Sequence, residues 1–222
     1  MKLSKYIDHT NLKQDASNND IKKLCEEAIN YDFMSVCINP SFVSLAKSLL
    51  EKSNVLVCTV VGFPLGQNTI DTKVFETKQA IEDGADEIDM VINITKLKAN
   101  DVKYCVNEIN EIKEITGDKI LKVIVETCLL NSKEIIRAME IVNESNADFI
   151  KTSTGFSLSG ANIEDITTWK KLIKDNKKIK AAGGIRSHDD LLLFIKEGAD
   201  RVGTSSGIKL ITKDAVIDSD KY

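Results

Sequence analysis

Three lysines of this chain stand inside short apolar runs, where an ammonium group is costly to bury. The runs are ILKVIVE (120–126), DFIKTSTG (148–155) and KIKAAGG (178–184), and the lysines are Lys122, Lys151 and Lys180. A carboxylate partner, loss of the proton, or both can reduce the free-energy cost of burying the lysine. A lysine that loses its proton near neutral pH is a nucleophile and can form a Schiff base with a carbonyl compound.

Each of these runs has the length and the β-branched content of a buried strand. Side chains alternate between the two faces of a strand, so the apolar set and the charged set of each run separate. The apolar set must pack against helices, so the charged set points into the space that the sheet encloses. The charged groups that four successive strands direct inward are Asp89, Lys122, Glu126, Lys151 and Lys180.

The five inward groups do not balance in charge. Three lysines against two carboxylates leave one excess positive charge if all five are ionised. Repulsion between ammonium groups about 6 Å apart, together with burial, is expected to lower the pKa of one lysine to about 7 to 8. A purely structural ladder of buried ion pairs is the alternative. We favour a catalytic site, because strongly perturbed groups gathered at one end of a sheet usually mark function.

Short strands alternate with amphipathic helices along the whole chain. The expected strands are 6–8, 35–38, 56–61, 87–93, 121–126, 149–152, 179–182 and 201–203, and the expected helices include 19–30, 72–82, 101–115, 132–144, 163–174 and 188–196. Eight strand–helix units without a linker predict a closed (β/α)8 TIM barrel, a single α/β domain over residues 1–222. An open doubly wound sheet is the competitor, but no GxGxxG or GxxxxGK[ST] loop follows an early strand.

The tetrapeptides DGAD (83–86), SNAD (145–148) and EGAD (197–200) recur at the predicted helix ends. Gly or Asn is expected to supply a left-handed C-cap there, after which the chain turns into the next strand. The polar end DSDKY (218–222) is expected to be a short mobile tail. Tyr222 could shuttle a proton at the mouth of the barrel, but an ordinary frayed end is the favoured interpretation.

Three turns rich in Gly, Ser and Thr follow the last three strands: TSTG (152–155), AGGIR (182–186) and GTSSG (203–207). Glycine lets backbone N–H groups approach an anion, and loops after strands seven and eight are the usual phosphate site of this barrel. Tight turning alone would also explain the glycines, but two such loops in these places favour a phosphorylated ligand. The candidate ligand contacts are Thr154, Gly155, Gly183, Gly184, Ser205 and Ser206, with Arg186 and Thr10 as weaker candidates.

Composition narrows the classes of function. The chain has 222 residues, a net charge of −4 and no run of 18 apolar residues, which argues against a general nucleic-acid binder and against a membrane protein. Five scattered cysteines and the lack of a signal-peptide core indicate a cytoplasmic protein with free thiols, and Cys37 is interpreted as core. Two histidines without metal-ligand spacing argue against a transition-metal centre.

The motifs of the chain resemble those of the deoxyribose-phosphate aldolases, in the same order over nearly the whole length. The matching segments are IDHTNL (7–12), VCINP (36–40), VVGFPLGQN (60–68), GADEIDMVIN (84–93), KVIVETCLL (122–130), FIKTSTGF (149–156), KAAGGIR (180–186) and GTSSG (203–207). KTSTGF and EIDMVIN together are highly specific. The resemblance implies that Lys151 is the Schiff-base lysine, Lys180 the second catalytic lysine and Asp89 the proton-relay aspartate. Lys122 is left as a supporting or substrate-binding group.

The resemblance further implies reversible cleavage of 2-deoxy-D-ribose 5-phosphate to D-glyceraldehyde 3-phosphate and acetaldehyde, in deoxyribonucleotide catabolism, without a metal or other cofactor. It implies a small phosphosugar as the partner, a homo-oligomer, and no nucleic-acid or membrane partner. Two rival functions are an acid–base phosphosugar isomerase and a non-catalytic phosphosugar-binding barrel. The residue pattern alone does not decide which lysine attacks; the resemblance assigns it.

Overall fold

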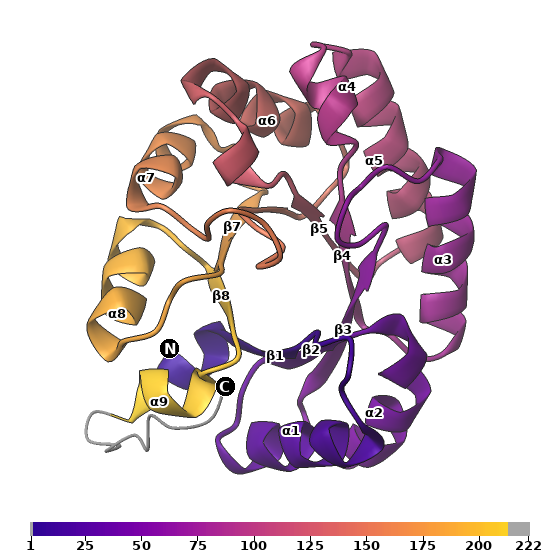
Figure 1. Ribbon diagram of the computed structural model, residues 1–222, viewed down its shortest axis with the longest axis vertical. Helices are drawn as coiled ribbons and strands as arrows, with labels where there is room; N and C mark the ends of the chain where they lie inside the picture. The colour runs from indigo at the N-terminus through magenta and orange to yellow at the C-terminus, as the bar shows by residue number, and fades with distance from the viewer. Residues whose placement is uncertain (1, 213–222) are drawn as a thin grey trace.

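Eight parallel strands close into a barrel in the computed structural model, which describes residues 2–212 (Figure 1). Each strand pairs with the next, and β8 pairs with β1 to complete the ring. The strands are β1 (Ile7–Asn11), β2 (Ser35–Ile38), β3 (Leu56–Val61), β4 (Glu87–Val91), β5 (Ile120–Ile124), β6 (Phe149–Lys151), β7 (Lys178–Ala182) and β8 (Arg201–Thr204). The predicted (β/α)8 fold is confirmed. The expected tail at 218–222, with Tyr222, lies outside the described residues.

Helices surround the barrel on its outer side, as Figure 1 shows. The α-helices are α1 (Asn18–Asn30), α2 (Val43–Leu50), α3 (Ile70–Glu82), α4 (Ile94–Lys98), α5 (Val102–Thr116), α6 (Ser132–Glu144), α7 (Ile163–Leu172), α8 (His188–Glu197) and α9 (Gly207–Ile211), and the 3-10 turns are η1 (Leu3–Tyr6), η2 (Pro40–Phe42) and η3 (Thr127–Leu129). Among residues 2–212, no helix is both long and apolar enough to cross a membrane.

Side-chain caps fix where several helices begin. Ser17, Asn131 and Ser187 each accept a hydrogen bond from the backbone N–H three residues ahead. The acidic side chain at that later position accepts a hydrogen bond from the N–H of the capping residue in return. Each of these capping boxes satisfies N–H groups that the start of a helix leaves open, so α1, α6 and α8 begin where the sequence places a cap.

The recurring tetrapeptides end their helices in two different ways. Gly84 of DGAD and Gly198 of EGAD have positive φ angles of 106° and 120°, as the sequence predicted. The prediction is wrong for SNAD, whose Asn does not adopt a left-handed conformation. There Ser145 Oγ donates to the carbonyl of Val142 and accepts from the N–H of Ala147, so a hydroxyl stabilises the turn instead.

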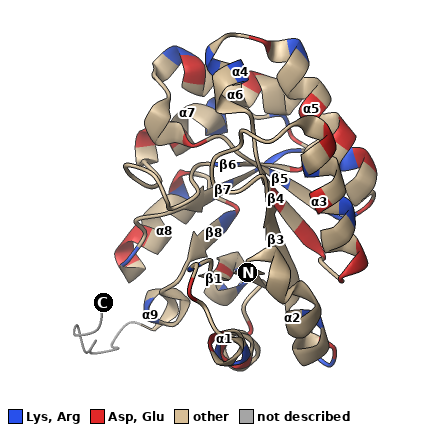
Figure 2. Cartoon of the chain, turned by 45° about the vertical axis from the view of Figure 1, so that its right-hand side comes forward, with Lys and Arg blue, Asp and Glu red and all other residues tan. Residues whose placement is uncertain are grey.

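Strand alternation separates two environments. The apolar residues of β4 and β5, such as Ile88 and Val123, are fully buried in the core that the sheet shares with the helices. Figure 2 shows charged residues on the helices and also on the strands within the ring. Burial of the apolar set between sheet and helices supplies the main stabilisation, and it leaves the interior of the barrel to the charged set.

Three strands end earlier than their sequence pattern predicts, β6 by a single residue, at Lys151. β4 ends at Val91, and Asn93 instead caps α4 by accepting the N–H of Lys96 at 3.1 Å. β5 ends at Ile124, and Glu126 has a left-handed backbone with φ 52°. The side-chain alternation of β5 is therefore lost before Glu126, so the predicted inward direction of this carboxylate beside the lysines is wrong.

Candidate active site

Asp89 on β4 contacts three lysines from three other strands. Its Oδ1 lies 2.8 Å from Nζ of Lys122, and its Oδ2 lies 2.8 Å from Nζ of Lys151 and 2.7 Å from Nζ of Lys180. The register of the barrel explains these contacts, because Asp89 is opposite Lys122 and Lys151 is opposite Lys180. The structure thus brings together four of the five residues that strand alternation directed into the barrel.

Three further charged groups, which the sequence analysis did not include, complete the network. Arg201 on β8 donates from Nε to Asp8 Oδ1 at 2.7 Å and from Nη2 to Glu87 Oε2 at 2.8 Å. Asp8 Oδ2 lies 2.5 Å from Nζ of Lys180, and Glu87 Oε2 lies 2.5 Å from Nζ of Lys122. Glu87 shares the inward alternation of its strand and could have been found. Arg201 could also have been found, because it alternates with the apolar Val202 on β8. Asp8 lies on β1, IDHTN, which has polar residues on both faces, so its alternation sets no direction.

These contacts close into a ring in which cations and carboxylates alternate. The members of this ion-pair ring, in order, are Lys122, Asp89, Lys180, Asp8, Arg201 and Glu87. The ring holds three cations and three carboxylates, and Lys151 attaches to it through Asp89 as a fourth cation. Within residues 2–212 the network therefore carries one excess positive charge, as predicted, although Glu126 is not a member and three unpredicted residues are.

Burial and ion pairing oppose each other in the ring. Burial opposes the charges of Lys122 and Lys180, yet the carboxylates of Asp89 and Asp8 raise both pKa values well above the ordinary value. Burial also opposes ionisation of Asp89, and the three lysines nevertheless hold its pKa well below the usual range. Arg201 overcomes the same effect of burial and lowers the pKa of Asp8. These residues therefore keep their charges near neutral pH.

Lys151 differs from the other two lysines in its access to solvent. Lys122 and Lys180 are fully buried, whereas Lys151 is 3% exposed and lines a cavity of about 540 Å³ at the mouth of the barrel. A small molecule that enters this cavity therefore meets one of the three amines that contact Asp89. The structure distinguishes Lys151 by geometry, which the residue pattern could not do.

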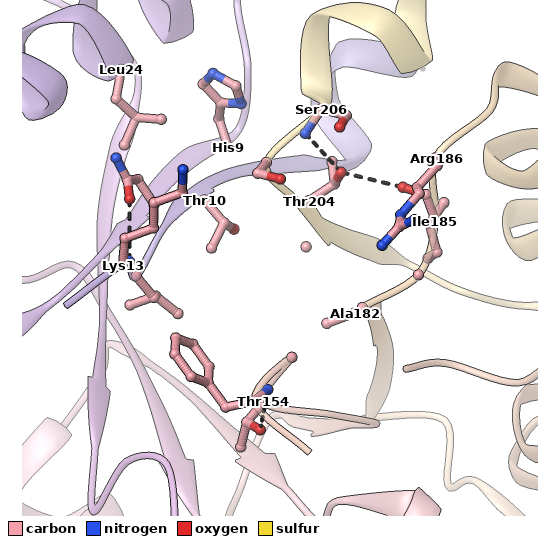
Figure 3. A pocket seen from close by; sticks show the side chains of 18 of the residues that line it. His9, Thr10, Lys13, Leu24, Thr154, Ala182, Ile185, Arg186, Thr204 and Ser206 are labelled. Atoms are coloured by element: carbon pink, nitrogen blue, oxygen red, sulfur yellow. Dashed lines mark hydrogen bonds between the residues drawn. The ribbon is translucent and has the colours of Figure 1, made fainter. Parts of the chain in front are cut away.

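The turns after β6, β7 and β8 form one side of this cavity, where Figure 3 shows Thr204, Ser206 and Arg186. The residues that sequence analysis named for a phosphate line it together: Thr154, Gly155, Gly183, Gly184, Ser205 and Ser206, with Arg186 beside them. Gly155, Gly183 and Gly184 have φ angles of 87°, 82° and 77°, which other residues rarely adopt. Glycine-rich turns of this kind present backbone N–H groups that suit an anion.

Residues of β1 and α1 form the other side of the cavity, of which the sequence analysis named only Thr10 as a candidate. Thr10 lines it together with Lys13 (Figure 3), and Lys23 lines it as well. His9 lines it as well, and its Nε2 lies 2.7 Å from Glu27 Oε2. Burial lowers the pKa of His9, so its imidazole is neutral at pH 7. The cavity is therefore larger than the site that the three glycine-rich turns would form alone.

Two residues that sequence analysis placed beside the substrate or the lysines serve other contacts. Glu126 Oε2 accepts the hydroxyl of Thr154 at 2.5 Å, and its Oε1 accepts the N–H of Thr154 at 3.2 Å. Glu126 therefore fixes the turn after β6. Lys122 is not among the residues that line the cavity, and its ammonium contacts Glu87 and Asp89. The position of Lys122 favours a supporting role over direct contact with a ligand.

Two thiols beside Asp89 raise the question of a metal site. One potential ligand atom from each of Cys37, Cys58 and Asp89 lies within 4.8 Å of the others. Asp89 already contacts three ammonium groups, whose charge would repel a cation. Burial raises the pKa of Cys58 well above its ordinary value, and its S–H donates to Asp89 Oδ1 at 3.1 Å. This set of donors suits a protonated network and not a metal ion.

Comparison with known proteins places this chain in a family. Residues 2–210 match the family described as DeoC/LacD family aldolase. The deoxyribose-phosphate aldolase of Malacoplasma penetrans is 62% identical over 210 residues, which cover 95% of each chain. A solved structure titled "QR15, an Aldolase" is 42% identical with a TM-score of 0.91 and 95% coverage of both chains. The tetrameric deoxyribose phosphate aldolase of Aeropyrum pernix is 32% identical with a TM-score of 0.85, covering 94% of this chain and 89% of its own. The chain belongs to the DeoC/LacD family of aldolases.

Proposed function

We propose that this protein is a deoxyribose-phosphate aldolase, which reversibly cleaves 2-deoxy-D-ribose 5-phosphate to D-glyceraldehyde 3-phosphate and acetaldehyde. One observation carries the proposal. Among the three lysines on Asp89, Lys151 alone borders the cavity, and within residues 2–212 it has no second carboxylate partner. An amine in this position can lose its proton and leave the ion-pair ring neutral, and a neutral amine attacks a carbonyl carbon. Membership of the aldolase family supports the same reaction.

Lys151 acts as the nucleophile in this proposal. Its neutral Nζ attacks C1 of the open-chain sugar, and loss of water gives a protonated imine. A base removes the proton of the C3 hydroxyl, the C2–C3 bonding pair moves toward the imine, and D-glyceraldehyde 3-phosphate leaves. The remaining enamine takes a proton at C2, and hydrolysis of the imine releases acetaldehyde and the free amine. The protonated imine acts as the electron sink, so these steps need no metal.

Asp89 and Lys180 serve as the proton relay. They lie 2.7 Å apart, and Asp89 also contacts the Nζ of Lys151 at 2.8 Å, so a proton on the reacting nitrogen has a path to the buried ring. General acid–base groups work best when they are held within hydrogen-bond reach of the reacting atoms. Lys122, which contacts the other oxygen of Asp89, keeps the carboxylate in this orientation.

The glycine-rich turns bind the phosphate of the substrate. Gly155, Gly183, Gly184, Ser205 and Ser206 line the same cavity as Lys151, so a bound phosphate would fix the distance from the turns to the reacting carbons. Binding energy from this remote group can then be used to orient C1 at the amine. Thr154 belongs to the turn 152–155, which directly follows Lys151. Glu126 holds Thr154 by a hydrogen bond, and Thr154 lines the cavity with the glycine-rich turns.

Reductive trapping tests the proposal. The protein is incubated with acetaldehyde and sodium borohydride, which reduces an imine to a stable ethyl amine, and peptides are mapped by mass spectrometry. We expect one ethyl group on Lys151. An acid–base isomerase or a non-catalytic phosphosugar-binding barrel gives no such adduct. Lys13, which lines the same cavity, is the internal control, because equal labelling of Lys13 and Lys151 would indicate non-specific alkylation and contradict the proposal.

The setting of the reaction is part of the same proposal. Substrate and products are small phosphosugars and an aldehyde, which supports a role in deoxyribonucleotide catabolism in the cytoplasm. The free thiols of the chain, among them Cys37 and Cys58, support a reducing compartment. A homo-oligomer is also proposed, in line with the tetrameric structure of the relative from Aeropyrum pernix. Size measurement in solution by light scattering tests this last point.

A further inference from the structure

Two members of the ion-pair ring lie away from the cavity. Arg201 is 4% exposed and Glu87 is fully buried, and neither is among the residues that line the cavity. Arg201 Nη2 contacts both carboxylate oxygens of Glu87, at 3.1 and 2.8 Å, and also binds Asp8. The catalytic steps described above do not use this pair. Its burial and its charges are costly to maintain, so a role beyond packing is worth testing.

Arg201 and Lys151 lie two strands apart in the register of the barrel. Lys151 is opposite Lys180 in the register of β6 and β7, and Lys180 is opposite Arg201 in the register of β7 and β8. Two strand spacings therefore separate Lys151 from Arg201, a distance of about 10 Å. At an effective dielectric constant of about 20, a unit charge at about 10 Å shifts a proton equilibrium by about one pH unit. The pair is close enough to influence Lys151 without touching it.

The charges of the ring determine the direction of that influence. With Arg201 and Glu87 both charged, the ring is neutral, and a proton on Lys151 adds an uncompensated positive charge. If Arg201 loses its charge, the ring becomes negative, and the proton on Lys151 is stabilised. If Glu87 loses its charge, the ring becomes positive, and the proton on Lys151 is destabilised further.

We propose that Arg201 and Glu87 are positioning residues that set, from the buried end of the ion-pair ring, the pH at which the amine of Lys151 loses its proton: Arg201 opposes the proton on Lys151, and Glu87 favours it. This inference rests on the proposed function, in which Lys151 is the reacting amine. The pair acts through Asp8, Lys180, Lys122 and Asp89, which connect it to Lys151. The charge of residues that never meet the substrate would then set the pH range of catalysis.

Groups from every strand of the barrel face this network. The titratable and charged groups are Asp8 on β1, Cys37 on β2, Cys58 on β3, Glu87 and Asp89 on β4, Lys122 on β5, Lys151 on β6, Lys180 on β7 and Arg201 on β8. Burial keeps Cys58 as a thiol, whereas a hydrogen bond from Cys58 lowers the pKa of Cys37. An ionised Cys37 would add a negative charge to this interior, so the test must include its removal.

The test measures kcat/KM against pH for Arg201→Gln, for Glu87→Gln and for the double variant. We expect the acid limb of the profile to move to higher pH by about one unit in Arg201→Gln and to lower pH by about one unit in Glu87→Gln. The double variant, which removes one charge of each sign, returns the limb toward its original position. Thermal unfolding of each variant is recorded in parallel, because both side chains are also structural.

A conservative variant separates charge from packing. Arg201→Lys keeps the positive charge but loses the two-pronged guanidinium contact with Asp8 and Glu87, so its limb should stay in place even if its stability falls. The series is repeated with Cys37→Ser, in which the opposite shifts should persist. If Arg201→Gln does not fold, the other two variants still test the inference. Glu87→Gln should move the acid limb to lower pH, and Arg201→Lys should leave it in place.

Three results would overturn the inference. The first is a shift of both single variants in the same direction, or no shift in either. The second is an Arg201→Lys profile displaced as far as that of Arg201→Gln. The third is loss of the shifts in the Cys37→Ser background. Borohydride trapping of the unsubstituted protein keeps the two proposals apart: an ethyl group on Lys151 with unmoved profiles contradicts this inference alone, whereas no adduct on Lys151 contradicts the proposed function.

Discussion

At the level of single residues, the lysines of the barrel differ in their partners more than in their burial. Lys122 and Lys180 each contact two carboxylates, whereas Lys151, among the described residues 2–212, contacts Asp89 alone and shares it with the other two lysines. A buried lysine with two anionic partners is a fixed cation, and a lysine without a carboxylate of its own is the one whose proton the network can release. The chemistry of Lys151 therefore follows from the number of its neighbours as well as from its access to the cavity.

The first residue-scale prediction concerns Lys151→Arg. A guanidinium keeps the positive charge but does not deprotonate, so it cannot form the imine. We expect kcat/KM for cleavage to fall by about 10³-fold or more, while binding of the phosphosugar stays measurable by calorimetry. Lys196→Arg, an exchange on the exposed surface of α8, is the matched control. Near-normal turnover of Lys151→Arg would show that another group carries the reaction.

A second residue-scale prediction concerns Lys180. Lys180→Leu removes a ring cation and one member of the proton relay, so Asp8 and Asp89 each lose a partner. The proton on Lys151 then compensates a negative ring. We expect the acid limb of kcat/KM to move to higher pH by about one unit and kcat to fall by about 10²-fold or more. Lys180→Arg keeps the charge, so its limb should not move; an unmoved limb in Lys180→Leu would reduce Lys180 to a structural role.

At the level of elements, strand alternation predicted the site because it is a local property of the chain. The bounds of β2 and β3 agree with the sequence pattern, and the alternation of β4 and β5 placed Asp89 and Lys122 on the inner face. Glu126 was misplaced because the alternation was extended past the end of β5 into a residue with positive φ. Arg201 was missed although it alternates with Val202 on β8, because Gly203, the other residue of its phase, has no side chain to mark that face.

A buried ion pair between α3 and α5 gives an element-scale prediction outside the site. Lys73 Nζ lies 2.7 Å from Glu108 Oε1 and donates to the carbonyls of Gly66 and Val91, both at 2.8 Å. Removing one partner leaves a buried charge alone, so Lys73→Met should lower the free energy of unfolding by about 3 to 5 kcal/mol in urea titrations. The pair lies outside the ion-pair ring, so the acid limb of kcat/KM should keep its position.

The double variant Lys73→Met/Glu108→Leu is the control for this pair. It removes both charges and should regain part of the lost stability. Recovery is incomplete because Glu108 also accepts the N–H of Asn93 at 2.9 Å, which leucine cannot do. Equal stability of the single and double variants would mean that the cost arises from packing rather than from the unpaired charge.

At the level of the whole molecule, the ion-pair ring can form only when the barrel closes. The contact between Asp8 and Arg201 joins residues 193 apart in the sequence, across the pairing of β1 with β8. No local pattern reports such a contact, which is why the closed ring could not be predicted although the sequence predicted half of its members. The same closure ties the protonation of the ring to the folded state of the entire chain.

This linkage predicts how stability depends on pH. The folded-state pKa values of Asp8 and Asp89 lie below their ordinary value of 3.8, so their contribution is present above that value and is lost as the pH falls toward the folded-state values. The folded-state pKa values of Lys122 and Lys180 lie above their ordinary value of 10.5, so their contribution is present below it and is lost as the pH rises further. The folded-state pKa of His9 lies below its ordinary value of 6.5 because its imidazole is buried, so stability also decreases as the pH falls below about 6.5. We expect Tm to be nearly constant from about pH 7 to about pH 9.

Catalysis should change inside the range where stability does not. If Lys151 alone releases a proton there, the acid limb of kcat/KM falls within the plateau of Tm, and both are measured on one buffer series. Asp8→Asn is the control. Removing this carboxylate lowers Tm at every pH of the series. Tm then falls less steeply at acid pH, because an asparagine has no proton to take up. A Tm that changes in parallel with kcat/KM near neutral pH would mean that the ring itself titrates there. The fixed charges of the ring could then no longer explain a neutral amine on Lys151.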